Sequence, residues 1–177
     1  MSDAATHAIT ELVRPIEDWP QPGVTFRDIT PLLADPAGFD AVLVAMASAA
    51  RALGPIDAIL GVESRGFVLG APMARELAVP FVPVRKEGKL PAETRAATYD
   101  LEYGTATLEI HVDALAPGAR VVVVDDVLAT GGTLTATQAL VEGAGATVAG
   151  HLVMIEIGVL GGRGRLEPTP LTALHTY

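Results

Sequence analysis

The chain alternates between continuous apolar runs and longer segments that have the spacing of helices. Apolar runs of strand length cover residues 56–62, 80–86, 120–126 and 146–159, and each predicts a buried strand. Helices are expected over the intervening segments, at residues 4–14, 36–53, 66–78 and 133–145. Because strands that are apolar throughout need cover on both faces, this alternation predicts an α/β fold with a mostly parallel central sheet flanked by helices.

Local signals refine the ends of two of these helices. Asp35 is a suitable N-cap and Pro36 suits the first helical position, so we expect a helix to begin here and to stop at Gly54. Pro72 lies within the segment 66–78, and it must either fall in the first turn of that helix or kink it.

Three segments interrupt the alternation. Residues 19–33, WPQPGVTFRDITPLL, contain turn-forming Pro and Gly and predict an extended, looped segment. Residues 87–98 show no periodicity and predict a long mobile loop, whereas residues 99–112 alternate apolar and polar positions around Gly104, as in a β-hairpin. With no linker, repeat or low-complexity tract, the 177 residues predict a single domain.

Charge and composition narrow the class of protein. The net charge of −9 argues against a nucleic-acid binder, which usually carries a basic face. The chain has no cysteine, its first twenty residues lack the apolar core of a secretory signal, and no apolar run approaches the roughly 20 residues that span a bilayer. We therefore expect a cytoplasmic protein without nucleic-acid or membrane partners.

The basic residues are unevenly distributed. Arg85, Lys86, Lys89 and Arg95 supply four of the twelve Lys and Arg residues within eleven positions. In an acidic protein such a cluster favours a site for a small polyanion. A solvated charged loop would give the same pattern and, for the cluster alone, is the commoner explanation.

The string VVVVDDVLATGGT, residues 121–133, is the most informative stretch of the chain. Asp125 and Asp126 end the most apolar strand, and the carboxyl ends of parallel strands are where α/β sheets bind ligands. The turn that follows leads into a helix, whose free N–H groups and positive dipole end hold phosphate. The loop lacks the Lys of a Walker A motif, so the expected phosphate ligands are backbone amides and hydroxyls of Ala129, Thr130, Gly131, Gly132 and Thr133.

We expect the two carboxylates to bind a group other than the phosphate. They can accept hydrogen bonds from ribose hydroxyls, or hold Mg²⁺ directly or through water. Together with the phosphate loop they fit a ribose 5-phosphate. A bare pair of acids would more often be a charged strand end before an ordinary helix cap, but the complete thirteen-residue string favours a site.

This string resembles the phosphoribosyl-pyrophosphate motif of type I phosphoribosyltransferases. PGVTFRDITPLL, GVESRGFVLG, VRKEGKLP and YDLEYGTATLEIH resemble further segments of the adenine phosphoribosyltransferase family, in the same order and at similar spacing. The resemblance implies the type I phosphoribosyltransferase fold, with a small N-terminal hood of approximately residues 1–34 and a flexible β-hairpin loop. It also implies a homodimeric pentosyltransferase of purine salvage that converts adenine and phosphoribosyl pyrophosphate into AMP and pyrophosphate with Mg²⁺.

The resemblance further assigns roles to individual residues. Phe26 would stack on adenine while the backbone of Val24 and Arg27 reads the purine edge, and Arg27 would also form a salt bridge within the hood. Glu102 would be the acid/base group, with Tyr103 close to the reacting groups. A cis peptide bond is expected between residues 63 and 64. The residues implied to bind pyrophosphate are Glu63, Ser64, Arg65, Arg85, Lys86 and Lys89, of which Arg65 also serves catalysis.

The same resemblance makes residues 87–98 a lid over the reaction centre and lets Arg85 reach across the dimer interface. Asp125 and Asp126 would contact the ribose and hold Mg²⁺ through the substrate and water rather than as certain direct ligands.

Two other functions stay open at this point. One is a phosphoribosyltransferase for another purine base, since only the resemblance of the FRDI segment favours adenine. The other is a regulatory protein that binds phosphoribosyl pyrophosphate without turning it over. The acidic charge, the LEYG and RKEGKLP segments and the lack of an obvious second domain favour an enzyme.

Overall fold

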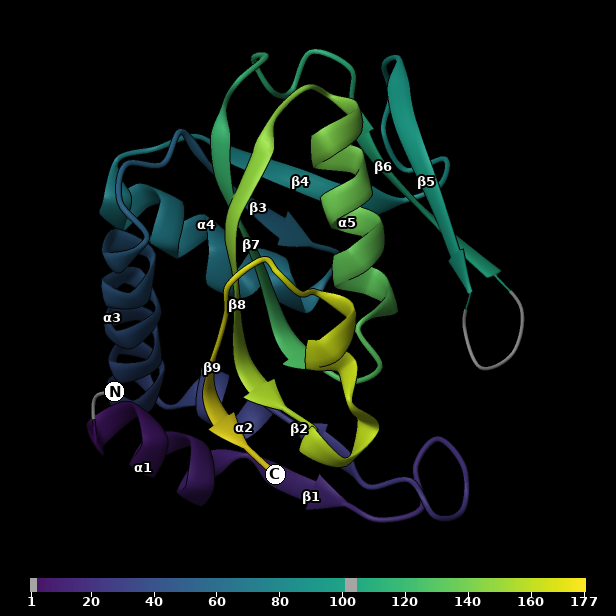
Figure 1. Cartoon of the computed structure of the whole chain (residues 1–177). Coiled ribbons are helices and arrows are strands. Elements are labelled where there is room, and N and C mark those ends of the chain that lie inside the picture. The colour runs from purple at the N-terminus through teal and green to yellow at the C-terminus, as the bar shows by residue number, and fades with distance from the viewer. Residues whose placement is uncertain (1–2, 101–104) are drawn as a thin grey trace.

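The computed structural model describes residues 3–100 and 105–177, with the side chain of residue 100 left aside (Figure 1). In this part of the chain a seven-stranded sheet has the strand order β5-β6-β4-β3-β7-β8-β9. The strands from β4 to β9 in that order are mutually parallel, while β6 runs antiparallel to β4 and β5 antiparallel to β6. The bounds are β3 Ala58–Val62, β4 Phe81–Lys86, β5 Thr94–Asp100, β6 Thr105–His111, β7 Arg120–Leu128, β8 Thr147–Glu156 and β9 Leu171–Thr176.

Helices cover both faces of the sheet, which confirms the predicted α/β architecture. On one face lie α1 (Asp3–Leu12), α3 (Pro36–Ala52) and α4 (Arg65–Leu77), and on the other lies α5 (Gly132–Gly143) (Figure 1). The valines of β7 alternate between the two cores: Val122 and Val124 pack with α3 and α4, whereas Val121 and Val123 pack with α5. This two-sided burial explains why the strand is apolar at consecutive positions.

The predicted helix starts are confirmed in part. The Asp35 side chain accepts a hydrogen bond from the Gly38 backbone N–H at 2.7 Å and caps α3, with Pro36 in its first turn. Helix α4 begins at Arg65, so Pro72 lies inside the helix rather than in its first turn. Among the described residues, no helix is long and apolar enough to cross a membrane.

The expectation of a loop over residues 87–98 is wrong for residues 94–98. Residues 94–98 belong to β5, which pairs with β6 from Thr94 opposite His111 to Asp100 opposite Thr105. The predicted hairpin is therefore longer than residues 99–112 alone. Of residues 94–99, the hydrophobic side chains of Ala97 and Tyr99 pack against the core around α5, so the sequence carries little of the alternation that marks a strand.

Short elements near the two ends of the chain were also missed. The strand β1 (Arg14–Ile16) follows α1, and the segment expected to be extended contains both β2 (Phe26–Asp28) and α2 (Thr30–Ala34). Beyond β8 come two 3₁₀ turns, η1 (Gly158–Leu160) and η2 (Gly162–Arg165), and the edge strand β9. These elements are short and are stabilised by tertiary contacts rather than by local pattern.

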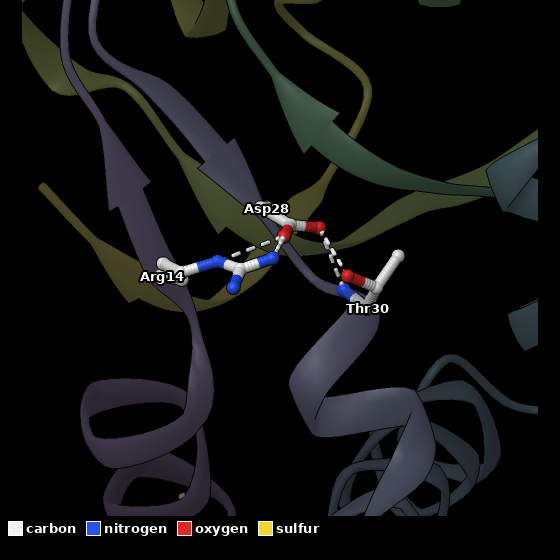
Figure 2. Close-up of polar contacts among 3 residues, drawn as sticks. All are labelled: Arg14, Asp28 and Thr30. Carbon is white, nitrogen blue, oxygen red and sulfur yellow. Dashed lines mark hydrogen bonds and ion pairs between the residues drawn. The ribbon is translucent and has the colours of Figure 1, made fainter.

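Strands β1 and β2 form a separate antiparallel ribbon, with Arg14 opposite Asp28 and Ile16 opposite Phe26. Figure 2 shows how Asp28 connects this ribbon to α2. One carboxylate oxygen accepts hydrogen bonds from Arg14, and the other accepts them from the backbone N–H and the hydroxyl of Thr30. Phe26 and Arg27 directly precede this anchor, so their position is tied to the start of α2.

Candidate active site

A cavity of about 710 Å³ lies between the β1–β2 ribbon, the end of β7 and the C-terminal segment. The stretch Pro20–Arg27 supplies much of its wall, and Ile157, Val159, Leu160 and Tyr177 supply another part. Val24, Phe26 and Arg27, the residues that the family resemblance assigned to the base, all line this cavity. The described structure therefore brings them together around a space that is large enough for a purine.

Aromatic and guanidinium groups fix the Phe26 side of this cavity. The Trp19 and Phe26 rings pack edge to face with centroids 4.4 Å apart, and the Arg65 guanidinium carbon lies 5.1 Å from the Phe26 centroid. The salt bridge expected for Arg27 within the hood is not found among its described residues: the Arg27 guanidinium carbon lies 3.8 Å from the Tyr177 ring centroid. The ion pair of the ribbon is instead the one between Arg14 and Asp28.

A second cavity of about 260 Å³ lies at the carboxyl ends of β3, β4 and β7. Its lining is mostly polar and combines carboxylates with basic and hydroxyl groups. Val127 and Arg65 line both cavities, so the two spaces adjoin at these residues. The polar residues of the second cavity are Glu63, Arg65, Lys86, Tyr99, Asp125, Asp126 and Thr133.

The start of α4 lies directly against β7, and this contact places Arg65 beside the paired acids. A Cβ atom on Gly66 would lie 2.6 Å from the Val124 carbonyl oxygen, a distance that only glycine avoids. Arg65 Nε lies 3.0 Å from Asp126 Oδ2, an ion pair whose angles do not meet those of a hydrogen bond. Arg65 Nη1 is buried without a partner among the described residues, so the guanidinium keeps a donor for a ligand.

The two adjacent carboxylates are held in an environment that disfavours their charge. Burial, and then the charge of Asp126, raise the pKa of Asp125 well above its ordinary value. Burial also raises the pKa of Asp126, although Arg65 opposes the effect. A bound cation would stabilise the ionised pair, which fits a site that holds a metal with its substrate.

The loop expected to bind phosphate, residues 129–133 (the phosphate loop), is built on a close contact with the C-terminal segment. Gly131, the N-cap of α5, has φ +85°, and a Cβ atom there would lie 2.7 Å from the Gly162 carbonyl oxygen. A Cβ atom on Gly162 would in turn collide with the Ala129 carbonyl oxygen. Both glycines are therefore required for the backbone packing that presents the N-terminus of α5 to the cavities.

The basic cluster is only partly directed at the second cavity. Lys86 lines it, whereas Arg85 pairs with Glu63 at 3.0 Å and donates to the Lys89 carbonyl oxygen at 3.4 Å. Burial opposes the shift, but hydrogen bonds from the Lys86 backbone N–H and from Arg85 lower the pKa of Glu63. The peptide bond between Glu63 and Ser64 is cis, as the resemblance implied. Ser64, Arg85 and Lys89 do not line either cavity.

Known proteins of one family resemble this chain in sequence over nearly its whole length. Residues 29–168 match the phosphoribosyl transferase domain family. The adenine phosphoribosyltransferase of Frankia alni is 54% identical over 175 residues, which cover 99% of this chain and 92% of that protein. The chain belongs to the adenine phosphoribosyltransferase family.

Solved structures of adenine phosphoribosyltransferases from distant organisms have the same fold. The enzyme from Rhodothermus marinus is 44% identical with a TM-score of 0.93, and the match covers 99% of this chain and 100% of that one. The enzyme from Saccharomyces cerevisiae, solved with an imino-altritol bisphosphate and adenine, is 36% identical with a TM-score of 0.92, over 98% and 99% of the two chains. These matches confirm the type I phosphoribosyltransferase fold.

Membership of the family does not by itself assign roles to single residues of this chain. The residues expected to carry acid/base chemistry, Glu102 and Tyr103, lie outside the described residues. Sequence reasoning missed Tyr99, Tyr177 and Gly162, all of which lie at the two cavities or pack on the phosphate loop. Tyr99 could have been found from its place two residues before the LEYG segment, whereas nothing local marks the other two.

The carboxylates at the second cavity suit Mg²⁺, the ion that phosphoribosyltransferases of this type use with their substrate. Mg²⁺ is usually held by one or two carboxylates together with substrate phosphates and water, rather than by an all-protein cage. Asp125 and Asp126 supply such carboxylates, and Asp126 Oδ2 is buried without a hydrogen-bond partner among the described residues. No group of three or more His, Cys, Asp or Glu side chains that could hold a metal ion gathers in residues 3–100 and 105–177.

Proposed function

We propose that this chain transfers the phosphoribosyl group of phosphoribosyl pyrophosphate to adenine where its two cavities meet. The observation that carries the proposal is the shared wall of Arg65 and Val127. A base in the first cavity and an activated ribose in the second would face each other there. The reaction breaks the bond between C1 of the ribose and pyrophosphate, joins C1 to N9 of adenine, and releases AMP, pyrophosphate and the N9 proton.

The first cavity is the proposed adenine site. Phe26 offers a ring for stacking, held by Trp19 on one side, and the backbone of Val24 and Arg27 offers hydrogen-bonding groups. The yeast relative, whose structure is described as containing adenine, supports this assignment through its similar fold. Residues 1–34 would act as a hood within a single domain, anchored by Asp28.

The second cavity and the adjoining loop are the proposed phosphoribosyl site. The N-terminus of α5 would bind the 5′-phosphate through the amides and hydroxyls of Ala129, Thr130, Gly131, Gly132 and Thr133. Asp125 and Asp126 would accept hydrogen bonds from the ribose hydroxyls. When bound beside them with the substrate, Mg²⁺ would neutralise charge on the pyrophosphate.

The basic groups around β3 and β4 are proposed to stabilise the departing pyrophosphate. Arg65 is best placed, since its unpartnered Nη1 can donate to a phosphate oxygen. Glu63, Ser64 and Lys86 would complete this subsite, while Arg85 and Lys89 would contribute after leaving their present contacts. Glu102 is proposed to exchange the proton of adenine, with Tyr103 beside it. The proposed lid is limited to residues 87–93, which precede β5, and it would exclude water.

The assembly and location are proposed from the family resemblance alone. We expect a homodimer in the cytoplasm, with Arg85 reaching toward the partner's site. Sedimentation of an active preparation would show a dimer, and an active monomer would contradict this arrangement.

A panel of bases tests the proposed activity directly. The purified chain would be mixed with Mg²⁺, phosphoribosyl pyrophosphate and one of adenine, hypoxanthine, guanine, xanthine, uracil or orotate, and the nucleotides separated by chromatography. AMP from adenine alone is the expected result. Product from another base alone would overturn the adenine site but keep the phosphoribosyl site. Binding of phosphoribosyl pyrophosphate without product from any base would indicate a regulatory protein.

A further inference from the structure

We infer that Tyr99 is a positioning residue of the phosphoribosyl site, acting through the hydroxyl of Thr133. Tyr99 comes from the hairpin strand β5, and Thr133 is the second residue of α5. The Thr133 hydroxyl donates to the Tyr99 hydroxyl oxygen at 3.3 Å, and both residues line the second cavity beside Asp125 and Asp126. The inference rests on the proposed function, because it treats the α5 N-terminus as the phosphate site.

The contact is part of an extended packing between β5 and α5. Residues 95, 97 and 99 share one face of β5, because side chains alternate along a strand. Ala97 and Tyr99 pack against the core that contains Leu134 and Leu140 of α5. At the far end of the helix, a Cβ atom on Gly143 would lie 3.3 Å from Arg95 Cδ, so that glycine makes room for the arginine stem. The strand is therefore held along most of the helix, and the contact with Thr133 holds the Tyr99 hydroxyl at the N-terminal end of α5. Figure 1 labels β5 and α5.

The chemistry of the two hydroxyls explains what this contact would do. A threonine hydroxyl has one proton to donate and can also accept. When that proton is donated to a phosphate oxygen, the Tyr99 hydroxyl can reverse its role and donate to Thr133. Tyr99 would then fix the rotamer of Thr133 and strengthen its hydrogen bond to the anion, since linked hydrogen bonds polarise one another.

The test is a double-mutant cycle between Tyr99→Phe and Thr133→Val. Affinity for phosphoribosyl pyrophosphate with Mg²⁺ is measured by calorimetry, and KM is measured for each substrate. Tyr99→Phe should weaken phosphoribosyl-pyrophosphate binding roughly five- to tenfold and leave the KM for adenine unchanged, because one hydrogen bond to a charged network is lost. In the Thr133→Val background, Tyr99→Phe should not weaken binding further. In the Thr133→Ser background, which keeps the hydroxyl, Tyr99→Phe should still weaken binding.

The chain offers a matched control on the opposite face of the same strand. Thr98 pairs with Thr107 through their hydroxyls at 3.0 Å, so Thr98→Val removes a hairpin hydroxyl that lies outside both cavities. It should leave both KM values unchanged. An equal effect of Tyr99→Phe in the wild-type and Thr133→Val backgrounds would reduce Tyr99 to a packing residue and overturn the inference. If the wild type makes AMP and Tyr99→Phe binds phosphoribosyl pyrophosphate as tightly as the wild type does, the inference is also overturned. If the wild type neither binds phosphoribosyl pyrophosphate nor makes AMP, the proposed function is overturned as well.

Discussion

Arg14 Nη2 lies 2.5 Å from Asp28 Oδ2 across the β1–β2 ribbon, while the other oxygen of Asp28 is bound by Thr30 (Figure 2). The hydrogen bonds from the Thr30 hydroxyl and backbone, followed by that from Arg14, lower the pKa of Asp28 to about 2. One carboxylate thus joins a strand of the ribbon to the start of the next helix.

The first prediction concerns the acid stability of this anchor. Because the folded pKa of about 2 is below the ordinary value of 3.8, the stabilisation is complete above pH 3.8 and is lost as the pH falls toward 2. Asp28→Asn should lower the free energy of unfolding at pH 6 and should make it less dependent on pH between 4 and 2. Urea titrations at several pH values measure this. Asp40→Asn removes an exposed carboxylate and serves as control; an identical slope for Asp28→Asn and wild type would contradict the assignment.

The second prediction concerns a histidine that lines neither cavity. His151 is fully buried in β8 and its Nε2 lies 3.0 Å from Gln138 Oε1, and burial lowers its pKa from 6.5 to about 4. The unfolded chain takes up a proton below pH 6.5 but the folded chain does not until about pH 4, so stability falls across this window. The full loss is about 3 kcal/mol.

His151→Gln should remove that pH dependence while keeping a group that can bond to Gln138. Urea titrations between pH 7 and 4.5 compare it with His7→Gln, which changes an exposed histidine of α1. A wild-type slope that survives in His151→Gln would show that another group is responsible.

The third prediction tests the backbone contact behind the phosphate loop. Gly162→Ala forces a methyl group against the Ala129 carbonyl oxygen and should destabilise the chain by about 1–3 kcal/mol. It should also raise the KM for phosphoribosyl pyrophosphate more than that for adenine, because the loop must shift. Gly164→Ala, in the same 3₁₀ turn, adds a methyl group with nothing within 4 Å and should change neither quantity. Equal behaviour of the two variants would mean that the loop does not depend on this contact.

The fourth prediction concerns the paired acids. Asp125→Asn combined with Asp126→Asn should reduce turnover roughly 100-fold or more while the fold is retained, because ribose and metal contacts are lost together. Circular dichroism and the AMP assay separate the two effects. Glu76→Gln, which breaks an exposed ion pair with Arg51 and lines neither cavity, controls for the loss of a carboxylate outside the proposed site. Near-normal turnover in the double variant would remove both acids from the proposed site.

The sequence predicted the parts of this structure that depend on local pattern. The buried strands and the cap at Asp35 follow from periodicity and side-chain chemistry, and the family resemblance added the cis bond at Glu63. The strand at residues 94–98 and the edge strand β9 were missed because they are stabilised by partners distant in sequence. The contact between Gly131 and Gly162, thirty-one positions apart, and the pairing of Arg85 with Glu63 likewise have no local signal.

The wall of the first cavity, the proposed adenine site, and the sheet are made by different stretches of the chain. Pro20–Arg27 forms much of the first cavity but adds no strand to the seven-stranded sheet, whereas the second cavity is set by the ends of β3, β4 and β7. Under the proposed function, substitutions in residues 20–27 should therefore alter which base is accepted without disturbing the buried strands. Evolution could change base preference there while the phosphoribosyl machinery stays constant, and a mutant library confined to residues 20–25 would sample new preferences in chains that still fold.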